Sequence, residues 1–386
     1  MEGHNLPNVC TRCLGRAFAM KGSGITNVAR GNDALARGNL IPPTFTHSKE
    51  SDCNICNGIF GRLQGYSNQM KMQSKNYEYE TFLIGSRFPQ EVIDLEEKFQ
   101  AAVRDSEGES LRKEFNRELG KQFEASSGKS TNFNDPDITF IIDMNYDSIK
   151  LQIKSLFIYG TYLKLIRNIP QTRWIKYSEI TDSVESVIGE AILPLAGGHE
   201  FFLHGAGRED VDVRMLGNGR EFVLEVTEPL RRNIDLEAAQ IAINSSGKGV
   251  VVHNLSLADK NKVIEVKSER NNKTYVAKIG VKGGTPEKQL MLNSLNAVCG
   301  KPIYQRTPLR VAESRSDAIR ERNILDARLL EMDENSATVE ITAEAGTYIK
   351  EFINGDNGRT KGSLSEVYGK SLEVLELDVI KIHRGE

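Results

Sequence analysis

The residues best placed to do chemistry surround Asp210, the last residue of the run Gly207-Arg208-Glu209-Asp210. Apolar residues follow at positions 211, 213 and 215, and this alternation predicts a strand directly after the acid. A carboxylate where a glycine-flanked loop meets a strand sits on rigid backbone, which is typical of an active-site residue. Two glycines at 217 and 219 predict a turn into a second strand at 222–226. The alternative is a solvated hairpin edge whose charges deter strand addition.

Cysteine is the second residue type that could do chemistry. Four of the five cysteines form two Cys-x-x-Cys pairs, which are Cys10, Cys13, Cys53 and Cys56. Four thiolates suit a tetrahedral zinc ion, and a site without an open position would be structural rather than catalytic. His4 and His47 are substitute ligands to consider, and redox-active or merely buried thiols remain the alternative. Cys299 stands alone, and we interpret it as a buried, inert thiol.

Length and composition limit what these residues can belong to. The chain has 386 residues, of which 39% are hydrophobic, so it can bury a large core divided among two or three domains. No apolar run approaches the roughly 18 residues that span a bilayer, and no signal peptide is recognised, so we expect a cytoplasmic protein. The formal net charge of -3 means that any nucleic-acid surface must be a local basic patch.

Three domains are expected along the chain. Residues 1–60 hold the paired cysteines and form the zinc module. Residues 61–170 alternate between strand and helix patterns and predict a small α+β domain, with strands at 79–84, 136–143, 148–154 and 156–162 and helices at 89–103 and 109–125. Near its end, cations and aromatic residues alternate as they do on surfaces for single-stranded RNA, at Lys154, Tyr159, Tyr162, Lys164 and Arg167. The alternative is that these aromatic residues belong to a core.

A boundary is predicted at 168–174, where Pro170 interrupts the pattern, and the third domain then covers residues 171–386. Helices are predicted at 179–193 and 235–244 and after Thr285, which would be an N-cap. Strands are predicted at 249–257, 262–267 and 274–281 as a meander, then at 325–332, 337–343 and 372–382. The fold class is therefore α+β, with a mainly antiparallel mixed sheet in the last domain.

Three of these segments resemble the motifs of pseudouridine synthases. Gly207–Asp210 is similar to their Gly-Arg-x-Asp segment, which carries the catalytic aspartate. Lys273–Ala277 resembles their Lys-x-Tyr-x-Ala strand, and Ala345–Lys350 resembles their Gly-Thr-Tyr-Ile-basic segment. Longer stretches, at 305–311 and 350–360, resemble the tRNA pseudouridine synthase ten family of archaea and eukaryotes. Members of that family also have an N-terminal paired-cysteine zinc module and a THUMP RNA-binding domain, so the resemblance covers almost the whole chain.

Two departures from the family pattern are visible. Glu313 stands where a histidine is expected, and Lys361 and Gly362 replace residues that usually include proline. Neither departure affects the motif residues themselves, so they bear on details of RNA contact rather than on the reaction.

The resemblance implies a function and a set of roles. The reaction is the isomerisation of uridine to pseudouridine in the TΨC arm of tRNA, at uridine 54, uridine 55 or both, with no cofactor beyond a structural Zn²⁺. Asp210 would be the nucleophile or base. The predicted substrate-binding residues are Tyr275, Tyr348, Lys350, Arg208 and Ile349. Among them Tyr275 would hold the flipped base. Lys350 would pair with Asp210, and Arg208 is its alternative partner. We expect no membrane partner and a monomer.

Two other classes of protein compete with this interpretation. One is a THUMP-containing tRNA methyltransferase or thiolation enzyme, but no Gly-x-Gly-x-x-Gly run follows a strand and no Ser-Gly-Gly-x-Asp loop occurs. The other is a zinc tRNA-binding protein without catalysis, in which Asp210 would be vestigial. A tyrosine on an alternating strand is also often core, and a lysine beside a helix is usually solvated. The joint match of the motifs favours the enzyme.

Overall fold

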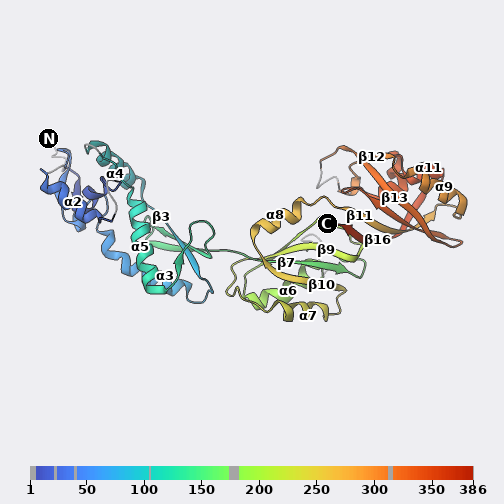
Figure 1. Cartoon of the computed structure of the whole chain (residues 1–386), viewed down its shortest axis with the longest axis horizontal. Coiled ribbons are helices and arrows are strands. Elements are labelled where there is room, and N and C mark those ends of the chain that lie inside the picture. The colour runs from blue at the N-terminus through green and yellow to red at the C-terminus, as the bar shows by residue number, and fades with distance from the viewer. Residues whose placement is uncertain are drawn as a thin grey trace. The chain divides into compact units, whose positions relative to one another are not determined.

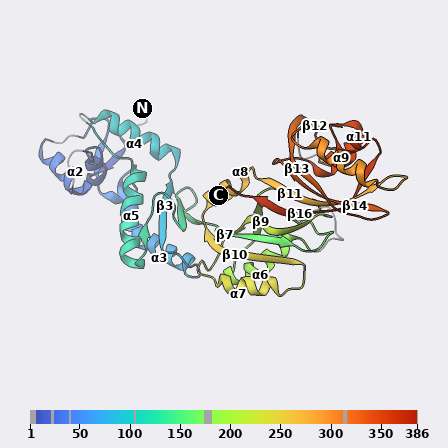
Figure 2. The same cartoon turned by 45° about the vertical axis from the view of Figure 1, so that its right-hand side comes forward.

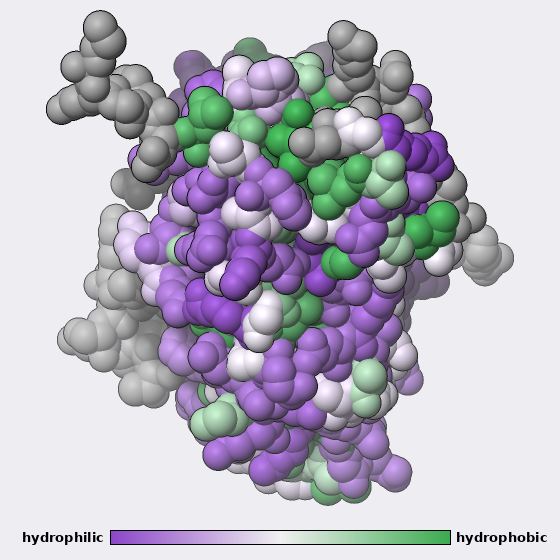
Figure 3. All heavy atoms as spheres, turned by 90° about the vertical axis from the view of Figure 1, so that its left-hand side faces the viewer, coloured by the Kyte–Doolittle hydropathy of each residue, from purple (hydrophilic) through white to green (hydrophobic). Residues whose placement is uncertain are grey.

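The computed structural model describes residues 6–20, 24–38, 41–103, 106–173, 182–311 and 316–385. These residues form two compact units (Figure 1). The first comprises Met1–Lys154 together with Glu228–Arg232, and the second comprises Ser155–Thr227 and Asn233–Glu386. In the part of the chain described, no helix is long and apolar enough to cross a membrane. The face seen in Figure 3 is mainly hydrophilic.

The first unit begins with the cysteine segment. Strand β1 (Asn8–Cys10) pairs in parallel with β2 (Thr46–Ser48), and helices α1 (Thr11–Arg16) and α2 (Asn27–Ala36) lie between them in sequence. The two helices pack with their backbones in contact, since a Cβ on Gly15 would lie 1.7 Å from the carbonyl oxygen of Asn27. This close packing and the β1–β2 pairing bring the first cysteine pair next to the second.

The rest of this unit is a four-stranded sheet with helices, and it confirms the predicted small α+β domain. The strand order is β4-β3-β5-β6, with β3 parallel to β4 and β5 and with β5 antiparallel to β6. Rings of Phe82, Phe123 and Phe140 meet edge to face in its core, with centroids 4.8 and 5.2 Å apart for the pairs that share Phe123. The elements are α3 (Leu63–Ser74), β3 (Thr81–Arg87), α4 (Gln90–Ala102), α5 (Leu111–Ser127), β4 (Ser130–Thr131), β5 (Ile138–Asp143) and β6 (Ser148–Ile153).

The second unit is built on one large sheet, which is ten-stranded within the described residues. The strand order is β10-β7-β9-β16-β11-β14-β13-β12-β15, and β8 pairs with β9. All pairings are antiparallel except that of β9 with β16, so the predicted mainly antiparallel α+β class is confirmed. The strands are β7 (Leu156–Lys164), β8 (Phe201–Gly205), β9 (Arg214–Val226), β10 (Val250–Ala258), β11 (Asn272–Val281), β12 (Pro302–Arg306), β13 (Ile319–Met332), β14 (Ser336–Ala343), β15 (Thr360–Lys361) and β16 (Leu372–His383).

Helices cover this sheet at both ends of the strand order. Helices α6 (Val184–Ala196) and α7 (Leu236–Asn244) lie side by side against the β10-β7-β9 end (Figures 1 and 2). At the other end, α9 (Lys288–Val298) lies against β13, and α11 (Leu364–Tyr368) packs against α9. The predicted helix at 179–193 is confirmed only in part, because residues 174–181 lie outside the described residues.

Three predictions about local structure were wrong. The segment 262–267 is not a strand but lies in helix α8 (Lys260–Ser268), because the side chain of Asp259 caps the backbone N–H of Lys262 at 3.1 Å. The expected turn at 217–219 is absent, since β9 runs through both glycines with positive φ angles. The helix after Thr285 begins at Lys288, and its N-cap is Glu287.

The strand at 156–162 belongs to the second unit rather than to the THUMP-like region. As β7 it pairs antiparallel with β9 and with β10, and the two compact units separate between Lys154 and Ser155. Seven of its nine residues are buried, from both faces of the strand. Such a strand requires neighbours on both sides and cover on both faces, which an edge of the small sheet cannot give. The predicted boundary at 168–174 is therefore displaced to 154–155.

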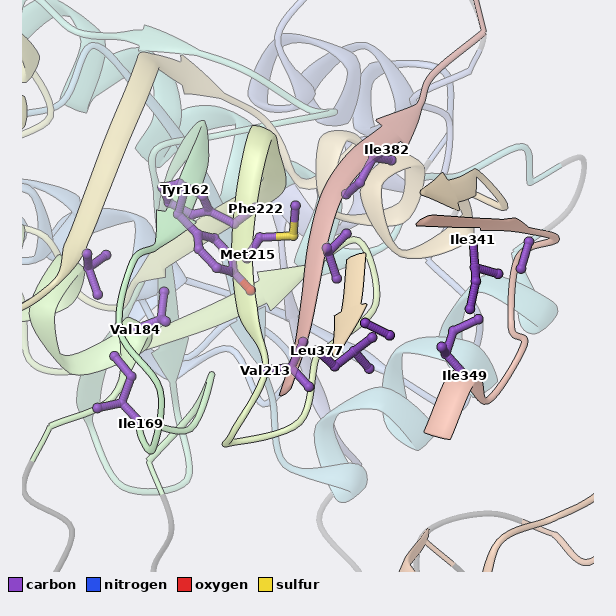
Figure 4. Close-up of a cluster of buried hydrophobic side chains, with 14 of the residues drawn as sticks. Tyr162, Ile169, Val184, Val213, Met215, Phe222, Ile341, Ile349, Leu377 and Ile382 are labelled. Atoms are coloured by element: carbon purple, nitrogen blue, oxygen red, sulfur yellow. The ribbon is translucent and has the colours of Figure 1, made fainter. Parts of the chain in front are cut away.

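In the centre of the large sheet, the backbones of β9 and β16 approach each other closely. Tyr162 of β7 and Phe222 of β9 have ring centroids 6.1 Å apart, beside the buried Met215 (Figure 4). Between Met215 and Phe222 on β9, Gly217 has a φ of 64°, and a Cβ there would lie 1.7 Å from the carbonyl oxygen of Ile380 in β16. Only glycine permits this approach of β9 to β16.

We predict that Gly217→Ala destabilises the protein, because it adds both left-handed strain and a clash with the backbone. The control is Gly247→Ala, since Gly247 has a similar φ of 70° but no atom within 4 Å of its Cβ position. The loss in free energy of unfolding should be roughly 1–3 kcal/mol larger for Gly217→Ala than for the control. Chemical denaturation measures both, and equal losses would contradict the importance of this close approach.

Candidate active site and metal centre

The loop at 206–213, between β8 and β9, carries the predicted catalytic Asp210, and a buried cation supports it. Lys164, the last residue of β7, has a fully buried side chain beneath this loop. Its ammonium group donates to the backbone carbonyl oxygens of Ile169 and Asp210 at 3.0 Å and of Val211 at 3.1 Å. Burial lowers the pKa of Lys164, and the carboxylate of Glu209 opposes this shift. The three bonds fix the backbone on which Asp210 is mounted.

A second buried network holds the residue just before Asp210. The carboxylate of Glu209 accepts hydrogen bonds from Nε of Arg220 and from the hydroxyl of Tyr162, both at 2.9 Å. The side-chain amide of Gln171 donates to that hydroxyl and to the carbonyl oxygen of Gly207, again at 2.9 Å. Burial raises the pKa of Tyr162 well above its usual range, and Glu209 adds to this shift, so the phenol stays a donor. A buried ion pair closed in this way is costly to break.

These networks correct one prediction from the sequence. Five residues were expected to face RNA, namely Lys154, Tyr159, Tyr162, Lys164 and Arg167. For Tyr162 and Lys164 this is wrong, because both are fully buried on the interior strand β7. Arg167 supports the protein as well, since it donates to the carbonyl oxygens of Asp212 at 2.9 Å and Leu377 at 2.7 Å. In this alternating run, Tyr162, Lys164 and Arg167 therefore support the Asp210 loop from within the protein.

The carboxylate of Asp210 lies between two cations. Nη1 of Arg310 is 2.6 Å from one of its oxygens, and Nζ of Lys350 is 3.3 Å from the other. Lys350 also contacts both oxygens of Asp212, at 2.7 and 2.8 Å. The structure thus brings Lys350 to Asp210 as predicted. Arg208, the alternative partner, is exposed and makes no hydrogen bond or ion pair with the described part of the chain.

Arg310 was not identified from the sequence as a site residue. Its Nε and Nη2 donate to the buried carboxylate of Glu351, at 2.7 and 3.2 Å, and its guanidinium carbon lies 5.9 Å from the ring centroid of Tyr348. Burial would lower the pKa of Arg310, but Glu351 and Asp210 outweigh it and raise the pKa. The signal in the sequence was the segment 305–311, which resembles the family. That segment does not indicate which residue pairs with Arg310.

Tyr275 lies in the electrostatic environment of the same carboxylate. Burial is the main cause that raises its pKa to about 12; the Asp210 carboxylate raises it further, and Arg220 opposes the shift. The phenol is therefore neutral at physiological pH. Lys273, two residues earlier on the same side of β11, has its pKa lowered to about 8 by burial and by Arg220. Tyr275 of the Lys-x-Tyr motif thus lies within electrostatic range of Asp210.

The remaining predicted residues lie where α10 (Ile349–Asn354) begins. The buried side chain of Gln305, from β12, accepts from the backbone N–H of Tyr348 and donates to its carbonyl oxygen, both at 2.9 Å. These bonds fix Tyr348, the N-cap residue, and the helix start behind it. Ile349 is only 4% exposed and packs in the hydrophobic core, so it anchors α10, and its contact with a substrate stays a prediction.

Four cysteines form a buried cluster in the first unit. All four Sγ atoms lie within 4.8 Å of one another, and the separations are 3.6 Å for Cys10 and Cys56 and 3.6 Å for Cys13 and Cys53. A tetrahedron with Zn–S bonds of about 2.3 Å has edges of roughly 3.8 Å, so the sulfur positions fit this ion. The donor set and its burial match a structural metal site.

Histidine does not join this cluster among the described residues. The ring of His47 is exposed, and its Nε2 is 3.0 Å from the hydroxyl of Thr11, while His4 lies outside the described residues. Behind the cluster, the buried Arg16 donates to Sγ of Cys13 at 3.3 Å and pairs with Glu96 of α4 and Glu114 of α5 at 2.8 and 3.0 Å. Arg16 thereby joins the cysteines to the THUMP-like helices.

We predict that Lys164→Met lowers the free energy of unfolding by roughly 3–5 kcal/mol, because three carbonyl oxygens lose a buried donor and Glu209 loses a nearby positive charge. Lys278→Met is the matched control, since Lys278 is exposed on β11. Guanidinium denaturation of both variants tests this, and equal midpoints would show that Lys164 does not support the loop.

Comparisons with known proteins agree with this architecture. Residues 157–383 match the family model "Pus10, C-terminal", and residues 66–143 match "Pus10 THUMP domain, archaeal". The protein from Thermoplasma acidophilum named tRNA pseudouridine synthase Pus10 is 47% identical, over 98% of this chain and 97% of its own. Its namesakes from Picrophilus torridus and Pyrococcus furiosus are 41% and 38% identical, over 98% and 99% of this chain and 98% and 96% of their own.

Solved structures give only a weak likeness. A crystal structure of a Cbf5-Nop10-Gar1 complex matches 58% of this chain and 48% of its own, with 17% identity and a TM-score of 0.33. That likeness adds nothing to the assignment. The family models and the relatives decide it: the chain belongs to the Pus10 family, with an archaeal-type THUMP domain and a Pus10 C-terminal domain.

Proposed function

We propose that this chain converts uridine to pseudouridine in tRNA, with Asp210 as the catalytic group. The observation that carries the proposal is the setting of Asp210, whose backbone is fixed by the buried Lys164 and whose carboxylate is paired with Lys350 and Arg310. The phenol of Tyr275 shares this environment. The family supports the choice of reaction, since its relatives are named tRNA pseudouridine synthases.

The reaction breaks the C1′–N1 glycosidic bond and forms a C1′–C5 bond, while C5 loses a proton and N1 gains one. No electron is transferred and no water is added, so catalysis needs no redox cofactor. The target base must leave its stack, and the flat side chain of Tyr275 would support the flipped uracil. A carboxylate beside the sugar can attack as a nucleophile or remove a proton as a base, and either role suits the position of Asp210.

The neighbouring residues have supporting roles in this proposal. Lys350 and Arg310 balance the charge of Asp210 and orient it, and each is held by a second acid, Asp212 or Glu351. Tyr348 is fixed next to Arg310 and would line the path of the substrate. Arg208 is exposed close to Asp210 in the sequence and is free to contact RNA phosphate. Ile349 is buried and would support the site by packing beneath the start of α10.

The proposed target is uridine 54, uridine 55 or both in the TΨC loop, as the resemblance of the sequence implies. The THUMP domain would bind another part of the same tRNA. A monomeric state and a cytoplasmic location remain predictions that go with this function.

We predict that Asp210→Asn abolishes pseudouridine formation but leaves the affinity for unmodified tRNA within a few-fold, because the amide keeps the shape of the side chain and loses its charge. Asp212→Asn is the control, since Asp212 shares Lys350 and is not placed on the reacting base. It should retain measurable turnover. Carbodiimide-blocked primer extension reads the product, and undiminished turnover of Asp210→Asn would remove this residue from the mechanism.

We further propose that Cys10, Cys13, Cys53 and Cys56 hold one structural zinc ion, which would cross-link the two halves of the cysteine segment. Metal analysis of the purified protein should find about one zinc per chain, and chelation should lower the melting temperature before it affects the chemical step. Cys13→Ser should lose the metal, whereas Cys299→Ser, outside the cluster, should keep it. A protein without metal, or Cys13→Ser with full zinc content, would contradict the site.

A further inference from the structure

A basic pocket lies beside the candidate active site in the second unit. It encloses about 380 Å³ and is lined by Arg270, Arg320, Arg322, Ala345, Gly346 and Tyr348. Arg320 and Arg322 are alternate residues of β13 and so project from the same face of the strand. None of the lining residues is acidic, although the whole chain carries a formal net charge of -3. Positive charge is therefore concentrated at this place.

Two of the three guanidinium groups are held in place by hydrogen bonds without being neutralised. Arg320 donates to the hydroxyl of Thr307 at 2.7 Å, and Arg322 donates to the carbonyl oxygen of Glu321 at 2.6 Å. Within the described residues neither of them, nor Arg270, forms an ion pair with a carboxylate. Nε of Arg322 is buried and has no hydrogen-bond partner there. A buried donor without a partner is costly, so an anionic acceptor at this guanidinium of Arg322 would stabilise it.

The pocket and the Asp210 site share a wall. The ring of Tyr348 lines the pocket and also lies 5.9 Å from the guanidinium carbon of Arg310, which pairs with Asp210. On the other side, Gly346 has a φ of 83°, and a Cβ there would lie 3.4 Å from Nη2 of Arg322. A side chain at this position would narrow the space in front of the arginine. The geometry thus leaves the pocket open next to the site of chemistry.

We propose that this three-arginine pocket binds a backbone phosphate of the tRNA, one flanking the uridine that is modified. Guanidinium forks match phosphate oxygens in geometry and charge, whereas a flat, neutral base would leave three cations unpaired. The inference rests on the proposed function and deepens it: the pocket would fix the strand beside the flipped nucleotide, while Asp210 and Tyr275 engage the base itself. Phosphate contacts position RNA without reading its sequence.

The test uses Arg322→Gln in the full-length protein, with Arg328→Gln as the matched control. Arg328 lies on the same strand but is exposed and paired with Glu340 at 2.6 Å, away from the pocket. Both changes are made in the Asp210→Asn background, so that the tRNA is not converted during titration. Arg322→Gln should weaken binding of unmodified tRNA about tenfold and reduce the slope of log K against log salt by about 0.7–0.9, as expected for one lost phosphate contact. Arg328→Gln should leave both unchanged.

A methylphosphonate placed at each phosphate near the target uridine identifies the ligand. At one flanking position, the methylphosphonate should weaken binding about tenfold to the protein that keeps Arg322. It should not weaken binding to the Arg322→Gln variant any further. An unchanged affinity and salt slope for Arg322→Gln would overturn the proposal. It would also be overturned if the losses of affinity caused by Arg322→Gln and by the methylphosphonate were additive at every position. The latter result would mean that Arg322 and the tested phosphates contribute to binding independently, so that the pocket does not hold a flanking phosphate. The proposed function fails separately, if the wild-type chain forms no pseudouridine.

Discussion

One buried ammonium group, that of Lys164, constrains the candidate active site more than any other interaction. Its three N–H donors meet three backbone carbonyl oxygens that come from both sides of the site, at Ile169 and at Asp210 and Val211. A lysine can be buried only if its donors are satisfied and its charge is compensated, and Glu209 lies 3.8 Å away. The sheet must therefore place β7 directly beside β9, and the position of Asp210 follows from that neighbourhood.

In the described part of the chain, the two cations that pair with Asp210 are each shared with a second acid. Lys350 is also bound by Asp212, and Arg310 is also bound by Glu351. If Asp210 changes its charge or its partner when a substrate is bound, both cations keep a carboxylate. Neither cation is therefore left without an ion pair if Asp210 loses its charge. In the proposed reaction, this sharing would keep the surroundings of Asp210 in place.

The residues of the candidate site were largely identified from the sequence, and the residues that support them were not. The motifs around Asp210, Tyr275 and Lys350 were recognised because function requires particular residue types at close spacing. The cysteine pairs were recognised for the same reason. Lys164, by contrast, donates its hydrogen bonds to backbone carbonyl oxygens, which any residue type can supply. Arg310 meets Asp210 from 100 positions away, a separation at which local pattern carries no information.

Local patterns failed in the same way wherever the environment of an element decided its structure. The alternation at 262–267 suggested a strand, but the cap at Asp259 makes a helix there. The strand that ends at Lys164 looked like part of the small sheet next to it in sequence, whereas its two buried faces require the large one. Burial on both faces is a property of the assembled sheet, and it became visible only with the strand order.

The strand order has a consequence for how the molecule is made. β16, the last strand in the order of the chain, lies between β9 and β11 in the interior of the sheet, and Gly217 admits it closely. During synthesis on the ribosome, the strands on its two sides emerge first and cannot join until residues 372–383 are made. The two parts of the sheet therefore stay separate in the nascent enzyme until nearly all of this sequence has been translated.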